Sequence, residues 1–411
     1  MTIFQTIAAL LVLAAAASYL NHRFVRLPAT IGLMVIALAF SLLLVALGEF
    51  GVIEVGRAAT LVRSIDFSGA LLHGMLAFLL FAGALHVDLA DLRSQSLPIG
   101  VLSTLGVLIA TFVSGTLFWG GAHLAGFDLP LVYALLFGAL IAPTDPIAAL
   151  GILKRVGAPK SLEIKITGES LFNDGIGVVV FLTVLDIALG HSRPQPGPIA
   201  LFLLEEAAGG VGLGLIMGWA VYRLLRTVDA YQVEILLTLA LAAGGYTLAE
   251  AIHVSAPIAI VVAGLVIGNH GRTFAMSDKT CEHLDTFWEL VDEILNAVLF
   301  VLIGLEVIAM KLDWAYVLTG VLAVAAVLIG RFASVAFPVL IMRFRQTFSP
   351  GTIRILTWGG LRGGISIALA ISLPLGPERD LILACTYIVV VFSVLVQGLT
   401  LGRVIGTGSA A

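Results

Sequence analysis

The stretch GESLFNDGIGVVVFL, residues 168–182, decides the fold class of this chain. It lies inside an apolar segment, about 162–189, that is long enough to cross a membrane as a helix. Asn173 and Asp174 fall near the middle of that segment, where a carboxylate costs at least ~2.5–3.5 kcal/mol on insertion scales. The position predicts that Asp174 binds an ion or a proton. The alternative is an Asp that is neutralised by protonation or paired with an arginine, and that holds helices together.

The composition is that of a polytopic membrane protein with almost no soluble mass. The 411 residues are 60% hydrophobic and 12% charged, whereas about a quarter of the residues of soluble domains are charged. The mean hydropathy is +1.09. The two cysteines, Cys281 and Cys385, cannot form a disulfide framework, and no CxxC or Cys/His cluster indicates a structural metal. We therefore expect no cofactor, no enzymatic activity and no nucleic-acid partner.

The apolar segments predict an all-α fold of thirteen transmembrane helices. The N-terminus lacks a basic n-region, so we expect the first segment to be a spanning helix rather than a signal peptide. The ninth segment is short, and the tenth begins with charged residues. The expected segments are 3–20, 27–47, 67–87, 97–119, 129–152, 162–189, 198–222, 232–252, 255–269, 287–309, 315–342, 352–374 and 380–403.

The distribution of basic residues fixes the orientation. With the N-terminus outside and the C-terminus in the cytoplasm, most of the 22 Lys and Arg residues fall in cytoplasmic loops. The outside receives a smaller set, which is Arg57, Arg63, Arg193, Lys311 and Arg379. A missed or invented span would reduce this asymmetry, so it supports the thirteen spans.

Two of the expected helices carry sequences that interrupt a helix. In the segment 129–152, Pro143 and Pro146 bracket Thr144 and Asp145, and each proline removes an amide donor. In the segment 352–374, four glycines flank Arg362. The alternatives are a proline kink in the first and a GxxxG-type packing face in the second. We expect both helices to be discontinuous near mid-membrane.

These interruptions occupy corresponding places in the chain. The fifth and twelfth segments become equivalent if two six-helix repeats of opposite membrane orientation are joined by a linker helix. Paired interruptions of this kind indicate the binding site of a transporter. Where such helices cross, exposed helix ends need opposite charges. Asp145 is expected to compensate N-terminal ends and Arg362 C-terminal ends.

The residues around Asp174 offer hard oxygen donors. Ser170 lies one turn before Asp174 on the same helix face, and Asn173 lies beside them. Carboxylate, hydroxyl and carbonyl oxygens suit an alkali cation. We expect Na⁺ or Li⁺ to be held by Asp174, Ser170 and carbonyls near Thr144. A second intramembrane carboxylate, Glu169, needs a partner, and we expect a structural ion pair between Glu169 and Arg331.

The motifs together resemble a known family. ESLFNDG follows a helix with TDP and precedes FWE, LNAVLFVLIGLE and WGGLRGGIS, in an order similar to the monovalent cation–proton antiporters, specifically the NhaP/NHE-type sodium–proton exchangers. The resemblance covers nearly the whole chain. It implies that Asp174 is the ion- and proton-binding carboxylate and that Asn173, Ser170 and Thr144 form or shape the site. It also implies the roles of Asp145 and Arg362 at crossed helices, and the Glu169–Arg331 pair.

The resemblance further implies a mechanism and an organisation. The single unit 1–411 would contain an ion-binding core at 97–189 and 315–403, a dimerisation domain at 1–87 and 232–309, and a linker helix at 198–222. The expected protein is a homodimer in the bacterial inner membrane that serves sodium and pH homeostasis. An Asn-Asp pair is similar to the electroneutral class, in which one carboxylate carries either one H⁺ or one Na⁺. Where some relatives have a third-helix carboxylate, this chain has His73, which we interpret as a helix-contact residue.

Three other functions remain open on the residues alone. K⁺/H⁺ exchange would use the same fold. A cation channel would need a carbonyl filter, and no TVGYG-like sequence occurs. An intramembrane aspartyl protease would need to pair Asp145 with Asp174, and no GxGD motif occurs. Asp292 and Glu293 are interpreted either as the lining of a cytoplasmic entry funnel or as a solvated helix end.

Overall fold

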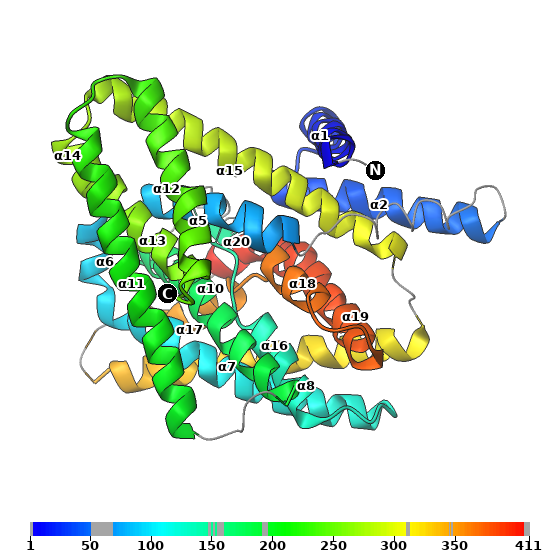
Figure 1. Ribbon diagram of the computed structural model, residues 1–411. Helices are drawn as coiled ribbons and strands as arrows, with labels where there is room; N and C mark the ends of the chain where they lie inside the picture. The colour runs from blue at the N-terminus through cyan, green and yellow to red at the C-terminus, as the bar shows by residue number, and fades with distance from the viewer. Residues whose placement is uncertain are drawn as a thin grey trace.

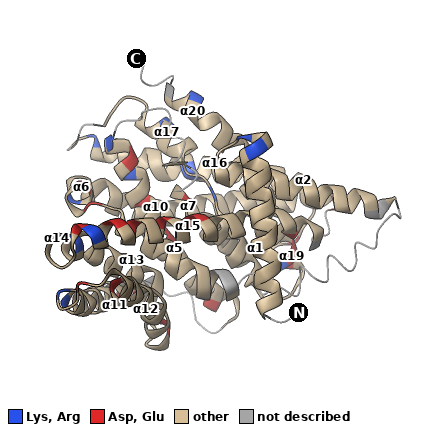
Figure 2. Cartoon of the chain, turned by 90° about the horizontal axis from the view of Figure 1, so that it is seen from above, with Lys and Arg blue, Asp and Glu red and all other residues tan. Residues whose placement is uncertain are grey.

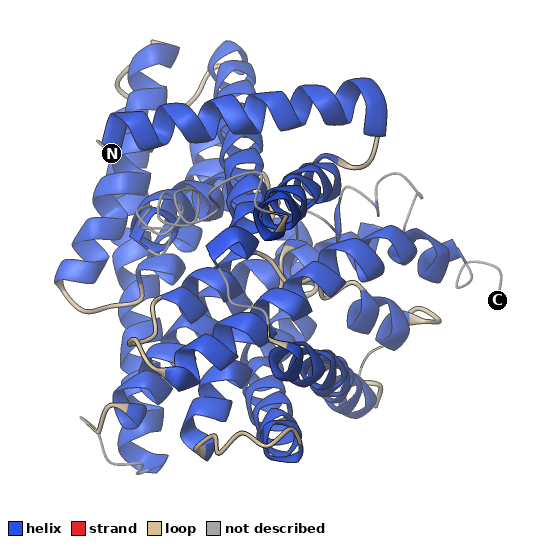
Figure 3. Cartoon of the chain, turned by 90° about the vertical axis from the view of Figure 1, so that its right-hand side faces the viewer, coloured by secondary structure: helices blue, strands red, loops and turns tan. Residues whose placement is uncertain are grey.

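The computed structural model describes residues 3–50, 69–146, 149–150, 153, 160–190, 196–309, 313–344, 346 and 348–406. Within these ranges the regular structure is helical and no strand occurs (Figure 3). The first half of the chain forms α1 (Ile3–Leu20), α2 (Ala29–Glu49), α5 (Leu76–Leu85), α6 (Leu89–Ser94), α7 (Ser96–Leu124), α8 (Leu131–Ile141) and α10 (Lys160–Ala188).

The second half of the chain contains ten helices in the described residues, of which α14 is the shortest, with three residues. They are α11 (Pro196–Leu225), α12 (Tyr231–Ala251), α13 (Ala256–Val266), α14 (Arg272–Phe274), α15 (Asp278–Glu306), α16 (Trp314–Met342), α17 (Thr352–Trp358), α18 (Gly364–Ile371), α19 (Pro377–Phe392) and α20 (Gly398–Gly406). Turns of π-helix at Asn21–Val25, Ala70–Met75, Ile267–Gly271 and Ser393–Gln397, and a 3₁₀ turn at Val307–Ala309, extend neighbouring helices.

The helices agree well with the expected segments. In the described residues, nine helical stretches are long and apolar enough to cross a membrane, and α5 and α8 are shorter apolar helices. α15 and the α17–α18 pair lie where the tenth and twelfth segments were expected. The prediction of a short ninth segment was wrong, because the helical path continues from Ala256 to Phe274. The polar residues after Ile267 continue the helix, and the Asn269 amide donates to the Leu265 carbonyl at 2.9 Å.

The helices pack in two groups. In the first group, α7 lies against α16 and α8, α10 lies against α7 and α8, and α19 lies against α16 and α18. In the second group, α13 packs against α5, α11 and α12, and α15 packs against α2 and α1. Figure 1 shows α7, α8 and α16 on one side of the molecule and α1, α2 and α15 on the other. α10 touches both groups, through α8 and α13.

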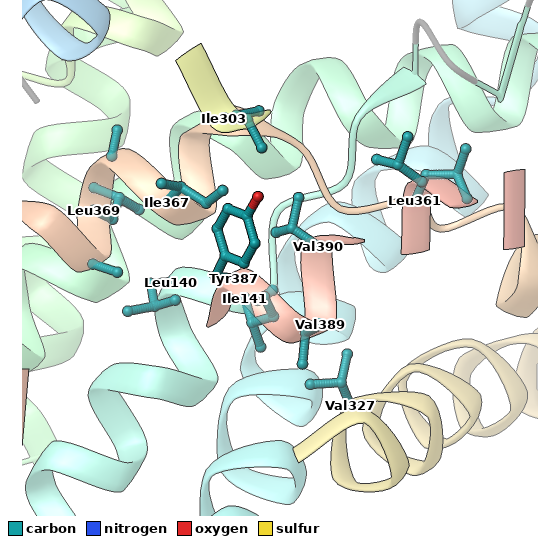
Figure 4. Close-up of a cluster of buried hydrophobic side chains, with 14 of the residues drawn as sticks. Leu140, Ile141, Ile303, Val327, Leu361, Ile367, Leu369, Tyr387, Val389 and Val390 are labelled. Atoms are coloured by element: carbon teal, nitrogen blue, oxygen red, sulfur yellow. The ribbon is translucent and has the colours of Figure 1, made fainter. Parts of the chain in front are cut away.

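Two of the helices in the first group are interrupted. α8 ends at Ile141, and residues 143–145 are not helical. α17 ends at Trp358, and residues 360–363 are not helical before α18 begins. Apolar side chains surround both interruptions: Figure 4 shows Leu140 and Ile141 from α8 near Tyr387 of α19, and Leu361 in the non-helical stretch. All four side chains are buried, so rigid packing holds the two interruptions in place.

The order of helix types repeats in the chain. A long helix, an interrupted helix and a second long helix follow one another as α7, α8 with its interruption, and α10. The same order recurs as α16, α17–α18, and α19 continued by α20. Residues 147–148 and 151–152, in the second half of the expected segment 129–152, and residues 154–159 after it lie outside the described residues.

Candidate ion-binding site

The two helix interruptions contact each other through hydrogen bonds. The Asp145 amide donates to the Leu361 carbonyl at 2.8 Å. Arg362 donates from Nη1 to the carbonyls of Ala142 and Pro143 at 2.6 and 2.9 Å. Carbonyls at a helix C-terminus lack intrahelical donors and carry partial negative charge. The buried Arg362 guanidinium therefore satisfies the C-terminal end of α8.

Asp145 lies at the opposite kind of helix end. A Cβ atom placed on Gly363 would be only 2.7 Å from Asp145 Oδ2, so the carboxylate and the backbone are in close approach. Gly363 immediately precedes α18, whose N-terminal amides carry partial positive charge. The crossing thus brings a carboxylate to a helix N-terminus and a guanidinium to a helix C-terminus. Glycine is required at 363 because a side chain there would displace Asp145.

A small hydrogen-bond network joins the first interruption to α10. The hydroxyls of Thr144 and Ser170 are 2.8 Å apart. Asn173 Nδ2 donates to the Thr144 hydroxyl at 2.8 Å, and Asn173 Oδ1 accepts from the Thr144 amide at 3.2 Å. All three residues are buried. The amide of Asn173 thereby fixes the position of Thr144, whose helix has ended and cannot supply an intrahelical donor or acceptor.

Asp174 is set apart from this network. It is 6% exposed, and among the described residues its Oδ1 atom has no hydrogen-bond donor. An unpaired buried carboxylate oxygen is costly, because burial removes water without replacing it. Such an oxygen fits a group that exchanges its partner, a proton in one state and a cation in another. The hydroxyl oxygens of Thr144 and Ser170 are hard donors, which suit an alkali cation such as Na⁺.

A cavity of about 1760 Å³ connects Asp174 with the end of the molecule where α6 and the start of α10 lie. Thr144, Asp145 and Asp174 line its inner part. Charged residues line its outer part: Arg23, Arg26, Asp88, Asp91, Lys160 and Glu163. The cavity therefore offers a route from a charged surface to the buried carboxylate.

Acidic residues of α15 line the same cavity. Glu289, Asp292 and Glu293 all do so, which favours the funnel interpretation of Asp292 and Glu293 over a solvated helix end. Carboxylates along a narrow entrance raise the local concentration of cations. In the sequence, these residues are recognisable as three acidic residues at the start of the otherwise apolar segment 287–309.

Glu169 and Arg331 form a bidentate ion pair between α10 and α16. Arg331 donates to both carboxylate oxygens of Glu169, with Nη2 at 3.1 Å from Oε2. Arg331 also donates from Nε and Nη2 to the Leu356 carbonyl of α17, at 3.2 and 2.9 Å. Glu169 is 1% and Arg331 6% exposed. This arrangement ties three helices together, and Glu169 lies five residues before Asp174 on α10.

Two polar residues that line the cavity, Ser366 and Asn296, were not predicted from the sequence. Ser366 is in the first turn of α18, and within the described residues its hydroxyl has no hydrogen-bond partner. Asn296 donates to the Asp292 carbonyl of its own helix at 2.8 Å. In the sequence, Ser366 could have been identified as the hydroxyl residue that closely follows Gly363 and Gly364. The side chain of His73 lies outside the described residues.

The fold and the site define a class of protein. Interrupted helices that cross at a buried, cavity-lining carboxylate are characteristic of secondary transporters. Residues 8–406 match the family described as sodium/hydrogen exchanger, transmembrane, and the chain belongs to this family. It is therefore a multi-pass membrane transporter.

Named relatives and solved structures agree with this assignment. The chain is 54% identical over 405 residues to the Na⁺/H⁺ antiporter NhaP of Pseudomonas aeruginosa, and the match covers 97% of this chain and 95% of that protein. It is 37% identical to the Na⁺/H⁺ antiporter NhaH of Halobacillus aidingensis, over 84% of each chain. The fold is similar to that of the sodium proton antiporter MjNhaP1 of Methanocaldococcus jannaschii, with a TM-score of 0.79, 20% identity and complete coverage of both chains.

Proposed function

We propose that the protein exchanges Na⁺ or Li⁺ for H⁺ by competition of the cation and the proton for Asp174. The observation that carries this proposal is that Oδ1 of Asp174 is buried, lacks a hydrogen-bond partner among the described residues, and belongs to a residue that lines the cavity. A protonated Asp174 and a cation-bound Asp174 are both neutral and can cross a low-dielectric barrier. The bare carboxylate is charged and cannot, and this difference couples the two fluxes.

The same geometry gives each neighbour a proposed role. Thr144 and Ser170 provide hydroxyl oxygens for the cation together with Asp174. Asn173 is a neutral amide and adds no second titrating group beside Asp174. One carboxylate that carries either one H⁺ or one Na⁺ makes the exchange electroneutral. K⁺ would satisfy the same donor types, and replacement of Na⁺ by K⁺ in the transport assay below separates the two.

The charged residues outside this set are proposed to hold the site rather than to bind the ion. Asp145 and Arg362 balance the helix ends at the crossing, in line with the Arg362 hydrogen bonds to Ala142 and Pro143. The Glu169–Arg331 pair fixes α10 against α16 and α17. Arg331 donates to both the Glu169 carboxylate and the Leu356 carbonyl. We therefore propose that the ion pair stays intact during transport.

We further propose alternating access by movement of the helix group that contains α7, α8, α10 and α16–α20 against the other group. With the N-terminus outside, the cavity of Asp174 opens to the cytoplasm, and the structure corresponds to an inward-facing state. The second group carries the proposed homodimer interface. A bacterial inner membrane is the proposed location.

Transport by purified protein in proteoliposomes tests the function. Wild-type protein should move protons in response to an inward Na⁺ or Li⁺ gradient, and Asp174→Asn should abolish this flux. Thr183→Ala is a matched control on the same helix, since the Thr183 hydroxyl donates to the Val179 carbonyl of α10 and lies outside the proposed site. Cation-dependent proton flux that persists in Asp174→Asn refutes the assignment.

A further inference from the structure

Two buried oxygen atoms without a hydrogen-bond partner belong to residues that line the cavity of Asp174. Among the described residues, several buried side-chain atoms lack a partner, and those whose residues line this cavity are Oδ1 of Asp174 and Oγ of Ser366. Ser366 is 1% exposed, so its hydroxyl is as deeply buried as the carboxylate. Burial of an unbonded hydroxyl costs free energy, and each such group in a folded protein calls for an explanation.

The position of Ser366 at the start of α18 explains why its hydroxyl has no partner within the helix. Helical hydroxyls commonly donate to a carbonyl three or four residues back, as Ser372 does to the Leu369 carbonyl at 2.8 Å. The residues at those positions before Ser366 are Gly363 and Arg362, which precede the helix and are not helical. The usual local bond is therefore not formed, and the hydroxyl remains available to a ligand.

The register of α18 turns Ser366 toward the crossing of the two interrupted helices. Gly363 is the N-cap of α18, so Ser366 is the third residue of the helix. Side chains tilt toward the N-terminus of their helix, and a side chain at the third position reaches back to the N-cap. At that N-cap, Oδ2 of Asp145 is 2.7 Å from the place of a Cβ atom on Gly363. Asp145 in turn interacts electrostatically with Asp174.

The charges around the cavity favour a cation as the partner of both oxygens. Asp145 and Asp174 line it together with Glu289, Asp292 and Glu293 of α15. Figure 2 shows Asp and Glu residues along α15. The N-terminus of α18 by itself would repel a cation, but the Asp145 carboxylate beside it offsets that partial positive charge. A serine hydroxyl has two acceptor lone pairs and is a hard donor that suits an alkali cation.

We propose that Ser366 is a further ligand of the transported cation, through its Oγ atom. This inference rests on the proposed exchange at Asp174 and extends that site to α18. One Na⁺ or Li⁺ then binds Oδ1 of Asp174 and Oγ of Ser366 and satisfies two buried oxygens at once. Because α10 contacts α18, the cation also links these two helices, and its binding stabilises the crossing.

Equilibrium binding of Na⁺ tests the proposal. Na⁺ is titrated at alkaline pH into the detergent-purified wild-type protein and its variants, and isothermal titration calorimetry gives the dissociation constant. Ser366→Ala should weaken Na⁺ binding about tenfold, the scale of one lost bond to a charged group. Ser366→Thr keeps a hydroxyl and should retain most of the binding. Ser372→Ala is the matched control, since the Ser372 hydroxyl is bonded to the Leu369 carbonyl, and it should bind Na⁺ as the wild type does.

Thermal melting separates a cation ligand from a residue that only supports the fold. Without Na⁺, Ser366→Ala should melt at or above the wild-type temperature, because it removes a buried hydroxyl that has no partner. With Na⁺, the melting temperature of the wild-type protein should rise by more than that of Ser366→Ala, since the more tightly bound ligand stabilises the folded state more.

The possible failures of this inference and of the proposed exchange are distinguishable. Unchanged Na⁺ affinity in Ser366→Ala, with binding abolished in Asp174→Asn, would overturn the role of Ser366 and leave that of Asp174 intact. Lower melting of Ser366→Ala without Na⁺, together with a wild-type response to Na⁺, would overturn it too, because the hydroxyl would then only support the fold. If the wild-type protein binds no Na⁺, both the exchange and the role of Ser366 are overturned.

Discussion

At the scale of single residues, the site combines a carboxylate oxygen that has no donor among the described residues with neighbouring side chains that are hydrogen-bonded. Asn173 and Ser170 both bond to Thr144, while Oδ1 of Asp174 has no donor among the described residues. Thr144, Ser170 and Asn173 thus form a fixed hydrogen-bond network, and the Asp174 carboxylate beside it can bind a proton or a cation. This contrast explains how neighbouring residues of one helix take different roles.

Removal of the Asn173 amide should loosen this network. In Asn173→Ala, Thr144 loses a donor to its hydroxyl and an acceptor for its amide, and we expect a loss of ~1–3 kcal/mol in stability. The Michaelis constant for Na⁺ should rise, because the Thr144 hydroxyl is no longer fixed. Thermal melting in detergent and Na⁺ titration in proteoliposomes check both effects. A variant with wild-type melting and an unchanged Michaelis constant would contradict the role given to Asn173.

The Glu169–Arg331 pair gives a second residue-scale prediction. Glu169→Gln leaves a buried guanidinium without its counter-charge, and breaking a buried pair in this way costs ~3–5 kcal/mol. The double variant Glu169→Gln with Arg331→Met removes both charges, so it should be more stable than Glu169→Gln alone. Melting curves of the two proteins compare them. If the double variant is the less stable one, the pair is not held together by its charges.

At the scale of helices, the two interruptions depend on a close approach between backbone and side chain. A methyl group on Gly363 would lie 2.7 Å from Asp145 Oδ2, so Gly363→Ala should separate the crossing and reduce exchange by at least tenfold. Gly120→Ala on α7 is the control, since nothing lies within 4 Å of a Cβ atom there. It should keep wild-type transport and gain slightly in stability, as expected for alanine in a helix. Equal transport by both variants would show that the crossing tolerates a side chain.

The sequence predicted these helices and their interruptions better than it predicted contacts between them. Prolines and glycines act locally, so the ends of α8 and α17 follow from Pro143, Pro146 and the glycines around Arg362. The cavity-lining position of Ser366 could not be predicted, because it depends on how α18 is oriented against α10. The ninth helix extends past its predicted end because polar residues can continue a helix beyond the hydrocarbon.

At the scale of the whole molecule, a cavity that reaches the buried Asp174 carboxylate implies competition between protons and Na⁺ for that group. Exchange should have a bell-shaped dependence on pH, since Asp174 must release a proton to bind Na⁺ and must regain one to return. Raising Na⁺ tenfold should move the acidic limb to lower pH by about one unit, by reciprocal linkage. Measurement of transport over a pH series at two Na⁺ concentrations checks this. If the acidic limb stays at the same pH at both Na⁺ concentrations, protons and Na⁺ do not compete for one site, and the account is contradicted.

Proton release on Na⁺ binding tests the central claim most directly. Purified protein in weakly buffered detergent solution at acidic pH should release about one proton per Na⁺ bound, because both occupy Asp174 in turn. A pH indicator records the release, and isothermal titration in buffers of different ionisation enthalpy counts the protons. The account predicts release by the wild-type protein and none by Asp174→Asn. Na⁺ binding without proton release, or equal release by both proteins, would contradict it.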